Sequence, residues 1–263
     1  MGTFGGSEDH TAIMLCEAAE LRQYSFCPTR LEARVPFPTG LTLLIAVSGA
    51  TAQKGAERLR DYNDAALLAR DAAAAAISDG FIKTVSGEHT PPMTLAGVVA
   101  AAAAQLQSES HASNVRNLVH ECIAPRDHGG AMWPDGALCR RFEQFFDESE
   151  VLVGGVARAL AKGDGAALGS LVDRSQALTE SHLKNTLEET EWLPRTARRL
   201  GCLAASAFGA GFGGSVWALA RAEEAEAMLE GWESAYAEAY PARRAQARFF
   251  AMRTPGPGAR SVG

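Results

Sequence analysis

The sequence predicts an α+β fold in which helices pack on one face of a largely antiparallel sheet. Three features carry this prediction: the strand-length apolar run Leu41–Val47, a long helical middle, and a glycine loop between two strand-like segments, 202–207 and 215–220. The strands gather before and after the helical middle instead of alternating with single helices. That order favours α+β over a parallel α/β sheet.

The first elements are one helix and three strands. We predict a helix over 8–20 and strands over 22–26, 33–37 and 41–47. The last strand, Leu-Thr-Leu-Leu-Ile-Ala-Val, is apolar almost throughout, so we expect it to be buried on both faces.

The remaining elements follow from helical periodicity and glycine breaks. Predicted helices are 59–78, 95–107, 142–160, 168–178, 190–200 and 223–240, and the final strand is 247–252. Residues 111–136 are the least readable part, with a mixed helical patch over 115–123 and then a loop. Gly201 suits the position just after a helix end, and 254–263 is expected to be a loose tail.

Composition excludes several classes of protein. The chain has 263 residues and a formal net charge of −6, so a nucleic-acid-binding surface is not expected. No apolar run is long enough to span a membrane, and the N-terminus lacks the pattern of a secretory signal. The five cysteines form no C-x-x-C pair, which indicates reduced thiols and a cytoplasmic location. No cluster with metal-ligand spacing is recognised.

The glycine loop has the spacing Gly209-x-Gly211-x-x-Gly214, which is that of a dinucleotide-binding loop. Such a loop needs a helix directly after it, because the pyrophosphate rests on the helix N-terminus. Here Val216–Ala220 is short, apolar and rich in strand formers. The pattern of strand, loop and strand argues against a Rossmann oxidoreductase.

The loop core, Gly209-Ala210-Gly211-Phe212-Gly213-Gly214, resembles the third conserved motif of the GHMP kinases, and most closely that of galactokinases. These enzymes phosphorylate small molecules with ATP. The resemblance implies a GHMP-kinase C-terminal-type sandwich and assigns Gly209, Gly211, Gly213 and Gly214 to support of the phosphates. Glycines suit that role because backbone can then approach backbone or phosphate closely.

Two further segments resemble galactokinase motifs. Gly6-Ser7-Glu8-Asp9-His10 is similar to G-x-M-D-Q, which implies that Asp9 contacts the sugar and is the catalytic base. The alternative is that Ser7 or Asp9 only caps a helix. Asp61-Tyr62-Asn63 resembles the Tyr-Asn pair of the family, which implies that Tyr62 contacts the sugar; the alternative is a residue on a helix surface.

The resemblance also implies a domain division and cofactors. Residues 1–20 correspond to the end of the kinase N-terminal half, 21–253 to the GHMP C-terminal domain and 254–263 to the tail. The G-E-H and G-L-S-S-S-A motifs of full galactokinases do not accompany these segments, so we expect a missing half from a longer reading frame or a partner chain. ATP and Mg²⁺ are the implied cofactors, with the metal ligands in that half.

Departures from the galactokinase pattern leave the sugar open. Glu8 and His10 replace Met and Gln, and Ser206-Ala207-Phe208 stands where galactokinases have Arg-Met-Thr. Galactose, a heptose or a pentose all fit the resemblance. The expected partners are a sugar and ATP, with neither nucleic acid nor membrane. The alternative function is a non-catalytic sugar sensor or interaction protein derived from a sugar kinase.

Overall fold

A computed structural model describes most of the chain, and the residues divide into two compact units. Described are residues 6, 8–25, 28–50, 56–82, 94–106, 112–209, 211–252 and 255–259, without the side chains of 56–59 and 62. The first unit comprises Met1–Gly5, Phe26–Pro28 and Gly55–Val151, and the second comprises Gly6–Ser25, Thr29–Lys54 and Leu152–Gly263. Each unit is described separately.

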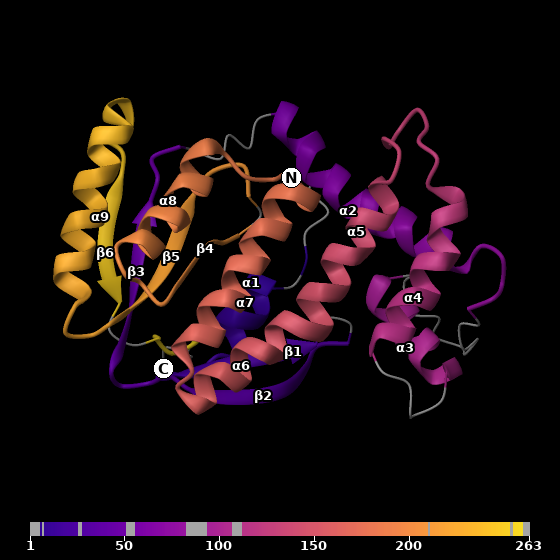
Figure 1. Ribbon diagram of the computed structural model, residues 1–263, viewed down its shortest axis with the longest axis horizontal. Helices are drawn as coiled ribbons and strands as arrows, with labels where there is room; N and C mark the ends of the chain where they lie inside the picture. The colour runs from indigo at the N-terminus through magenta and orange to yellow at the C-terminus, as the bar shows by residue number, and fades with distance from the viewer. Residues whose placement is uncertain are drawn as a thin grey trace. The chain divides into compact units, whose positions relative to one another are not determined.

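The first unit is helical (Figure 1). Its described helices are α2 (Ala56–Ile77), α3 (Leu95–Leu106), α4 (Ala112–Ile123) and α5 (Ala137–Phe146), with a 3₁₀ turn η1 (Ala124–Arg126). A π-helical turn η2 (Asp147–Leu152) follows α5. Helix α4 contains the helical patch expected over 115–123 and begins three residues before it. Its buried Val115, Val119, Cys122 and Ile123 recur at helical spacing.

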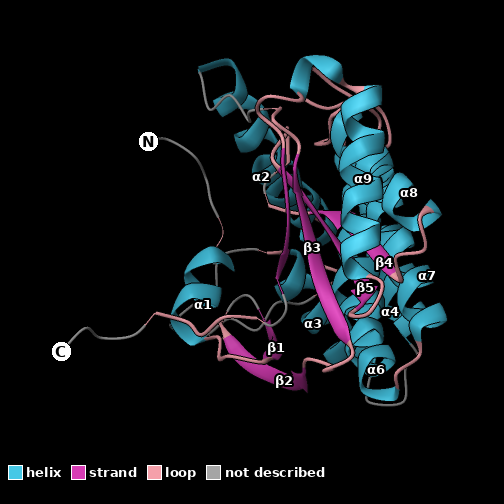
Figure 2. Ribbon diagram, turned by 90° about the vertical axis from the view of Figure 1, so that its left-hand side faces the viewer, coloured by secondary structure: helices cyan, strands magenta, loops and turns pink. Residues whose placement is uncertain are grey.

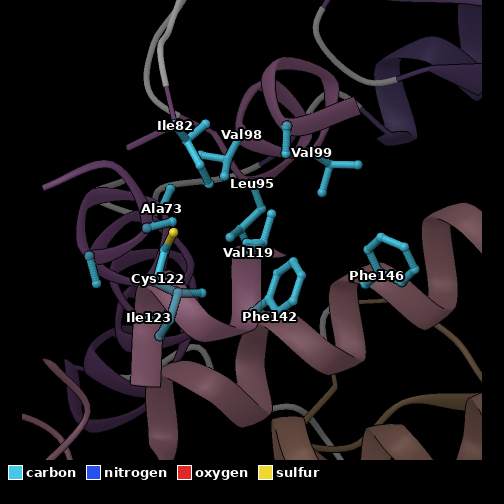
Figure 3. Close-up of a cluster of buried hydrophobic side chains, with 14 of the residues drawn as sticks. Ala73, Ile82, Leu95, Val98, Val99, Val119, Cys122, Ile123, Phe142 and Phe146 are labelled. Atoms are coloured by element: carbon cyan, nitrogen blue, oxygen red, sulfur yellow. The ribbon is translucent and has the colours of Figure 1, made fainter. Parts of the chain in front are cut away.

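A core of aliphatic and aromatic side chains holds these helices together (Figure 3). Val119, Ile123 and Phe142 are fully buried, and Val98 is nearly so. The Phe142 and Phe146 rings pack at 5.8 Å between centroids. This unit therefore buries its own apolar face, with many alanines of α2 allowing close approach of the helices.

The second unit contains two antiparallel sheets. Strands β1 (Glu20–Ser25) and β2 (Arg30–Pro36) form a hairpin. The larger sheet has the order β4-β5-β3-β6, with every neighbouring pair antiparallel. Its strands are β3 (Leu41–Val47), β4 (Ala204–Ala207), β5 (Ser215–Arg221) and β6 (Arg248–Met252).

Seven helical segments accompany these sheets in the described part of the second unit. They are α1 (Glu8–Leu15), α6 (Val153–Lys162), α7 (Gly165–Leu178), the π-helical turn η3 (Thr179–Leu183), α8 (Glu188–Arg199), α9 (Ala225–Ala239) and the 3₁₀ turn η4 (Pro241–Arg243). Figures 1 and 2 show α8 and α9 beside the larger sheet.

Helices cover both faces of the larger sheet, so the expectation of helices on one face is wrong. Leu44, Val216 and Ala218 point toward α8 and α9, where Leu193, Trp232 and Tyr236 complete a buried cluster. The alternate residues, including Leu43 and Leu219, pack against α6 and α7. The reason is that β3 and β5 carry apolar side chains on both faces of the sheet. Exposing either face to water is unfavourable, so both are covered by helices.

The α+β class is confirmed, and so is the strand after the glycine loop. Ser215–Arg221 is a strand paired with both β3 and β4, where a Rossmann loop would have a helix. The loose tail expected over 254–263 stays a prediction, and only residues 255–259 of it are described. Residues 255–259 are tied to α1 and to the turn after it by three backbone hydrogen bonds. The domain division at residues 20 and 253 stays a prediction.

Candidate functional site

The glycine loop joins the ends of β4 and β5 in a run of left-handed backbone. Gly209, Gly211, Gly213 and Gly214 have φ of +83°, +84°, +125° and +92°, and Phe212 between them has φ of +56°. Side chains disfavour this region, so the loop can adopt its path only because it is glycine-rich. Ala210 lies outside the described residues.

The loop offers backbone donors to a ligand. Within the part of the chain that the structure describes, the N–H groups of Gly209 and Gly213 make no hydrogen bond. Backbone N–H groups without a protein partner can bind an anion such as a phosphate oxygen. The geometry therefore fits a phosphate.

The end of β3 anchors the C-terminal side of the loop. Ser48 donates to the Gly214 carbonyl through both its N–H (3.0 Å) and its Oγ (2.7 Å), and Gly214 N–H donates to the Ala50 carbonyl at 3.1 Å. The Tyr236 hydroxyl of α9 donates to the Ser48 carbonyl at 2.7 Å. Burial raises the pKa of this hydroxyl, so it remains a donor throughout the physiological range.

The segment after η3 anchors the other side. Phe212 N–H donates to the Asn185 carbonyl, and a Cβ at Gly211 would overlap the carbonyl and side chain of Asn185. Glycine at 211 is therefore required by the close approach as well as by its φ.

A buried glutamine holds the strand that leads into the loop. Gln176 of α7 is 5% exposed, and its Oε1 accepts from Ala207 N–H (2.9 Å) and Ser206 Oγ (3.0 Å). Its Nε2 donates to Glu180, whose other oxygen pairs with Arg195. The Gln176 amide oxygen thus holds the last two residues of β4 through two hydrogen bonds, and the amide nitrogen is held in turn by Glu180.

A small cavity lies beneath the loop. It has a volume of about 100 Å³ and is lined by Gly209, Gly211 and Gly213 together with residues of the 179–190 segment, among them Asn185 and Thr190. Such a volume admits waters or one phosphate-sized group, and not a whole sugar or nucleotide.

Asp9 lies in the first turn of α1, and its side chain is exposed. It is the second residue of the helix and so does not occupy the capping position; Ser7, the other capping candidate, lies outside the described residues. Among the described residues no hydrogen bond or ion pair joins Asp9 to the glycine loop. Its catalytic role stays a prediction.

Tyr62 belongs to α2 of the first unit. Its side chain is outside what the structure describes, so the sugar contact assigned to it stays a prediction. No group of three His, Cys, Asp or Glu side chains that would suit a metal lies among the described residues.

Sequence reasoning missed the residues that hold the loop: Ser48, Gln176, Asn185 and Tyr236. No local pattern marks them, because each acts on a segment distant in sequence. The Ser48–Gly214 bond spans 166 residues. The only available signal was the position of Ser48 directly after an almost entirely apolar strand.

The architecture and the loop together define a class. The described part of the second unit has a four-stranded antiparallel sheet with a glycine loop between two of its strands, β4 and β5. Residues 156–238, from α6 through α9, match the family model described as GHMP kinases C terminal. This segment is therefore similar to the C-terminal part of the GHMP kinases, and the fold of the chain is galactokinase-like.

Comparison with solved structures concerns the fold. The galactokinase of Lactococcus lactis, solved in complex with galactose, aligns with a TM-score of 0.68 at 18% identity over 99% of this chain. The chain spans 57% of the length of that galactokinase. The L. major mevalonate kinase, solved with R-mevalonate, aligns over 96% of this chain and 53% of its own with a TM-score of 0.44 at 18% identity. No curated protein sequence matches the chain.

Proposed function

We propose that this chain is the C-terminal part of an ATP-dependent sugar kinase. The observation that carries the proposal is the glycine loop, with two backbone donors available in a sequence that matches the galactokinase motif. In the proposed reaction a sugar hydroxyl oxygen attacks the γ-phosphorus of ATP. The bond from that phosphorus to the β,γ-bridging oxygen breaks, and ADP leaves.

Asp9 is the proposed base. Its carboxylate accepts the proton of the attacking hydroxyl, which raises the nucleophilicity of the oxygen in the transition state. The glycine loop would hold phosphate oxygens through Gly209 and Gly213 N–H, because fixed donors stabilise developing charge without reorganising. Tyr62 is the proposed sugar contact.

ATP and Mg²⁺ are the proposed cofactors. The glycine loop fits a phosphate group, whereas the described residues contain no cluster of metal ligands. When bound, the cation neutralises charge on the β- and γ-phosphates. We propose that its ligands and the G-L-S-S-S-A phosphate loop come from a further stretch of the same polypeptide or from a partner chain.

The proposed location is the cytoplasm. Four of the five cysteines, Cys16, Cys122, Cys139 and Cys202, are free thiols in the structure, as expected in a reducing compartment. No helix among the described residues has the length and apolarity needed to cross a membrane. Cell fractionation tests the location, and recovery outside the cytoplasmic fraction would contradict it.

The first experiment is to sequence the DNA upstream of the Met1 codon. In-frame codons for G-E-H and G-L-S-S-S-A would supply the missing parts of a kinase on one polypeptide. A stop codon followed by a ribosome-binding site would direct the search to a partner chain. The protein so defined is then assayed for ATP-dependent phosphorylation of hexoses, heptoses and pentoses.

Asp9→Asn is the decisive variant for the chemistry. We expect kcat to fall by about 10²–10⁴-fold, because the amide cannot accept the proton. Glu226→Gln, which removes one exposed carboxylate from α9, is the charge-matched control and is expected to keep its activity. Full activity in Asp9→Asn would exclude Asp9 as the base.

The alternative is a sugar sensor, favoured by the lack of a G-L-S-S-S-A loop in this sequence. Isothermal titration distinguishes the two functions. Sugar binding without ATP turnover, in the protein that contains all its parts, would support sensing and overturn the kinase proposal.

A further inference from the structure

Helix α1, which carries Asp9, cannot be held by its own apolar side chains. None of its eight residues is buried, and Ile13, Met14 and Leu15 are 57%, 65% and 44% exposed. Isolated helices of this length are unstable in water. The helix therefore depends on contacts from elsewhere in its unit.

Two sets of hydrogen bonds meet at the C-terminal end of α1, beside the β1–β2 hairpin (Figure 2). From β1, the Tyr24 hydroxyl donates to the Leu15 carbonyl at 2.9 Å, and Arg22 donates to the same oxygen. These side chains satisfy one of the carbonyls that a helix end leaves open.

The second set comes from the chain after β6. Gly258 N–H donates to the Cys16 carbonyl at 2.9 Å, and Ala259 N–H donates to the Ile13 carbonyl. The tail therefore satisfies two more carbonyls at the same helix end.

The turn after α1 is joined to the same tail. Ala19 N–H donates to the Pro255 carbonyl at 3.1 Å, while the Ala19 carbonyl accepts from Phe37 N–H at 2.9 Å. Ala19 has φ of +61°, a conformation that alanine adopts only when its surroundings impose it. The two hydrogen bonds supply that constraint.

The tail can pack against α1 in this way only with glycine at position 258. A Cβ at Gly258 would lie 2.6 Å from the Cys16 carbonyl oxygen and 2.7 Å from that of Ile13. Both atoms are backbone and cannot move aside without moving α1. Two residues away, a Cβ at Gly256 would meet nothing within 4 Å.

We propose that Pro255, Gly258 and Ala259 form a latch that holds α1 in place and thereby positions Asp9. Gly258 and Tyr24 are then positioning residues, acting on Asp9 through the helix. The latch itself rests only on contacts within the second unit; its effect on catalysis rests on the proposed function.

Hydrogen exchange of the whole chain tests the latch without any assay of activity. Gly258→Ala is expected to raise amide exchange across residues 8–19 at least tenfold, while β3 and β5 exchange as in the wild type. Gly256→Ala, the matched control, is expected to exchange as in the wild type throughout. Equal protection of α1 in Gly258→Ala and the wild type would overturn the latch.

Kinetics test the positioning role in the active protein. Gly258→Ala is expected to lower kcat at least tenfold and leave the KM for ATP unchanged, and Tyr24→Phe to lower kcat by a smaller factor. Faster exchange in α1 with unchanged kcat would overturn the positioning role. If Asp9→Asn keeps full activity, the proposed function fails, and the exchange result still decides the latch.

Discussion

Glycine is required at position 211 for two independent reasons, its backbone conformation and its close contact with Asn185. Its φ of +84° disfavours any side chain, and the Asn185 backbone occupies the space of a Cβ. Gly209 has nearly the same φ, +83°, but nothing within 4 Å of its Cβ position. Substitution of Gly209 therefore tests backbone strain alone, whereas substitution of Gly211 tests backbone strain together with steric overlap.

Gly209→Ala is expected to cost about 1–2 kcal/mol of unfolding free energy, from the left-handed backbone alone. Gly211→Ala is expected to cost roughly 1–3 kcal/mol more, because the loop or the Asn185 segment must move. Urea unfolding measures both values. Equal losses in the two variants would contradict the close packing of the loop against Asn185.

At the scale of elements, the junction of α8 and β4 packs against α9 through a buried thiol. Cys202 is 2% exposed, and its sulfur lies 3.7 Å from that of Met228. Burial raises the pKa of the Cys202 thiol to about 11. In the unfolded chain a thiol has a pKa of roughly 8.5.

This difference makes stability depend on alkaline pH. Above about pH 9 the unfolded chain loses the thiol proton while the folded chain retains it, so the free energy of unfolding falls as pH rises toward about 11. The contribution present below pH 9 is on the order of 3 kcal/mol. Cys202→Ala is expected to flatten the fall in urea-unfolding free energy between pH 8 and 11, and Cys16→Ala to leave it unchanged. The same dependence of unfolding free energy on pH in Cys202→Ala and the wild type would contradict the role of the Cys202 thiol.

At the scale of the whole molecule, two units have separate hydrophobic cores. The core of the first lies among α2–α5, and that of the second lies on both faces of the larger sheet. Phe142 is fully buried in the core of the first unit, and Leu193 is fully buried in the core of the second. Cavities at these positions should therefore act locally.

Phe142→Ala is expected to cost about 3–5 kcal/mol and to raise hydrogen exchange in α2–α5, with β3 and β5 unaffected. Leu193→Ala is the reciprocal variant, with faster exchange in α8, β4 and β5 only. A uniform rise across both units in either variant would show that they unfold as one.

The sequence by itself determined several of the elements and the resemblance to the GHMP kinases. The apolar run Leu41–Val47 became β3 with the predicted bounds, and the run after the glycine loop became β5. Both were predictable because continuous apolar residues and left-handed glycines act locally. The loop residues Gly209–Gly214 likewise carried the resemblance that the family model and the fold confirm.

Only the tertiary structure decided how those elements are covered and held. The covering of both sheet faces, the anchoring of the loop by Ser48, Gln176 and Asn185, and the seating of the tail on α1 are contacts between distant segments. The local conformational preferences of the residues do not indicate which donor bonds to which carbonyl when the two are distant in sequence. That pairing is settled when apolar burial brings the segments together and leaves each buried polar group to find a partner.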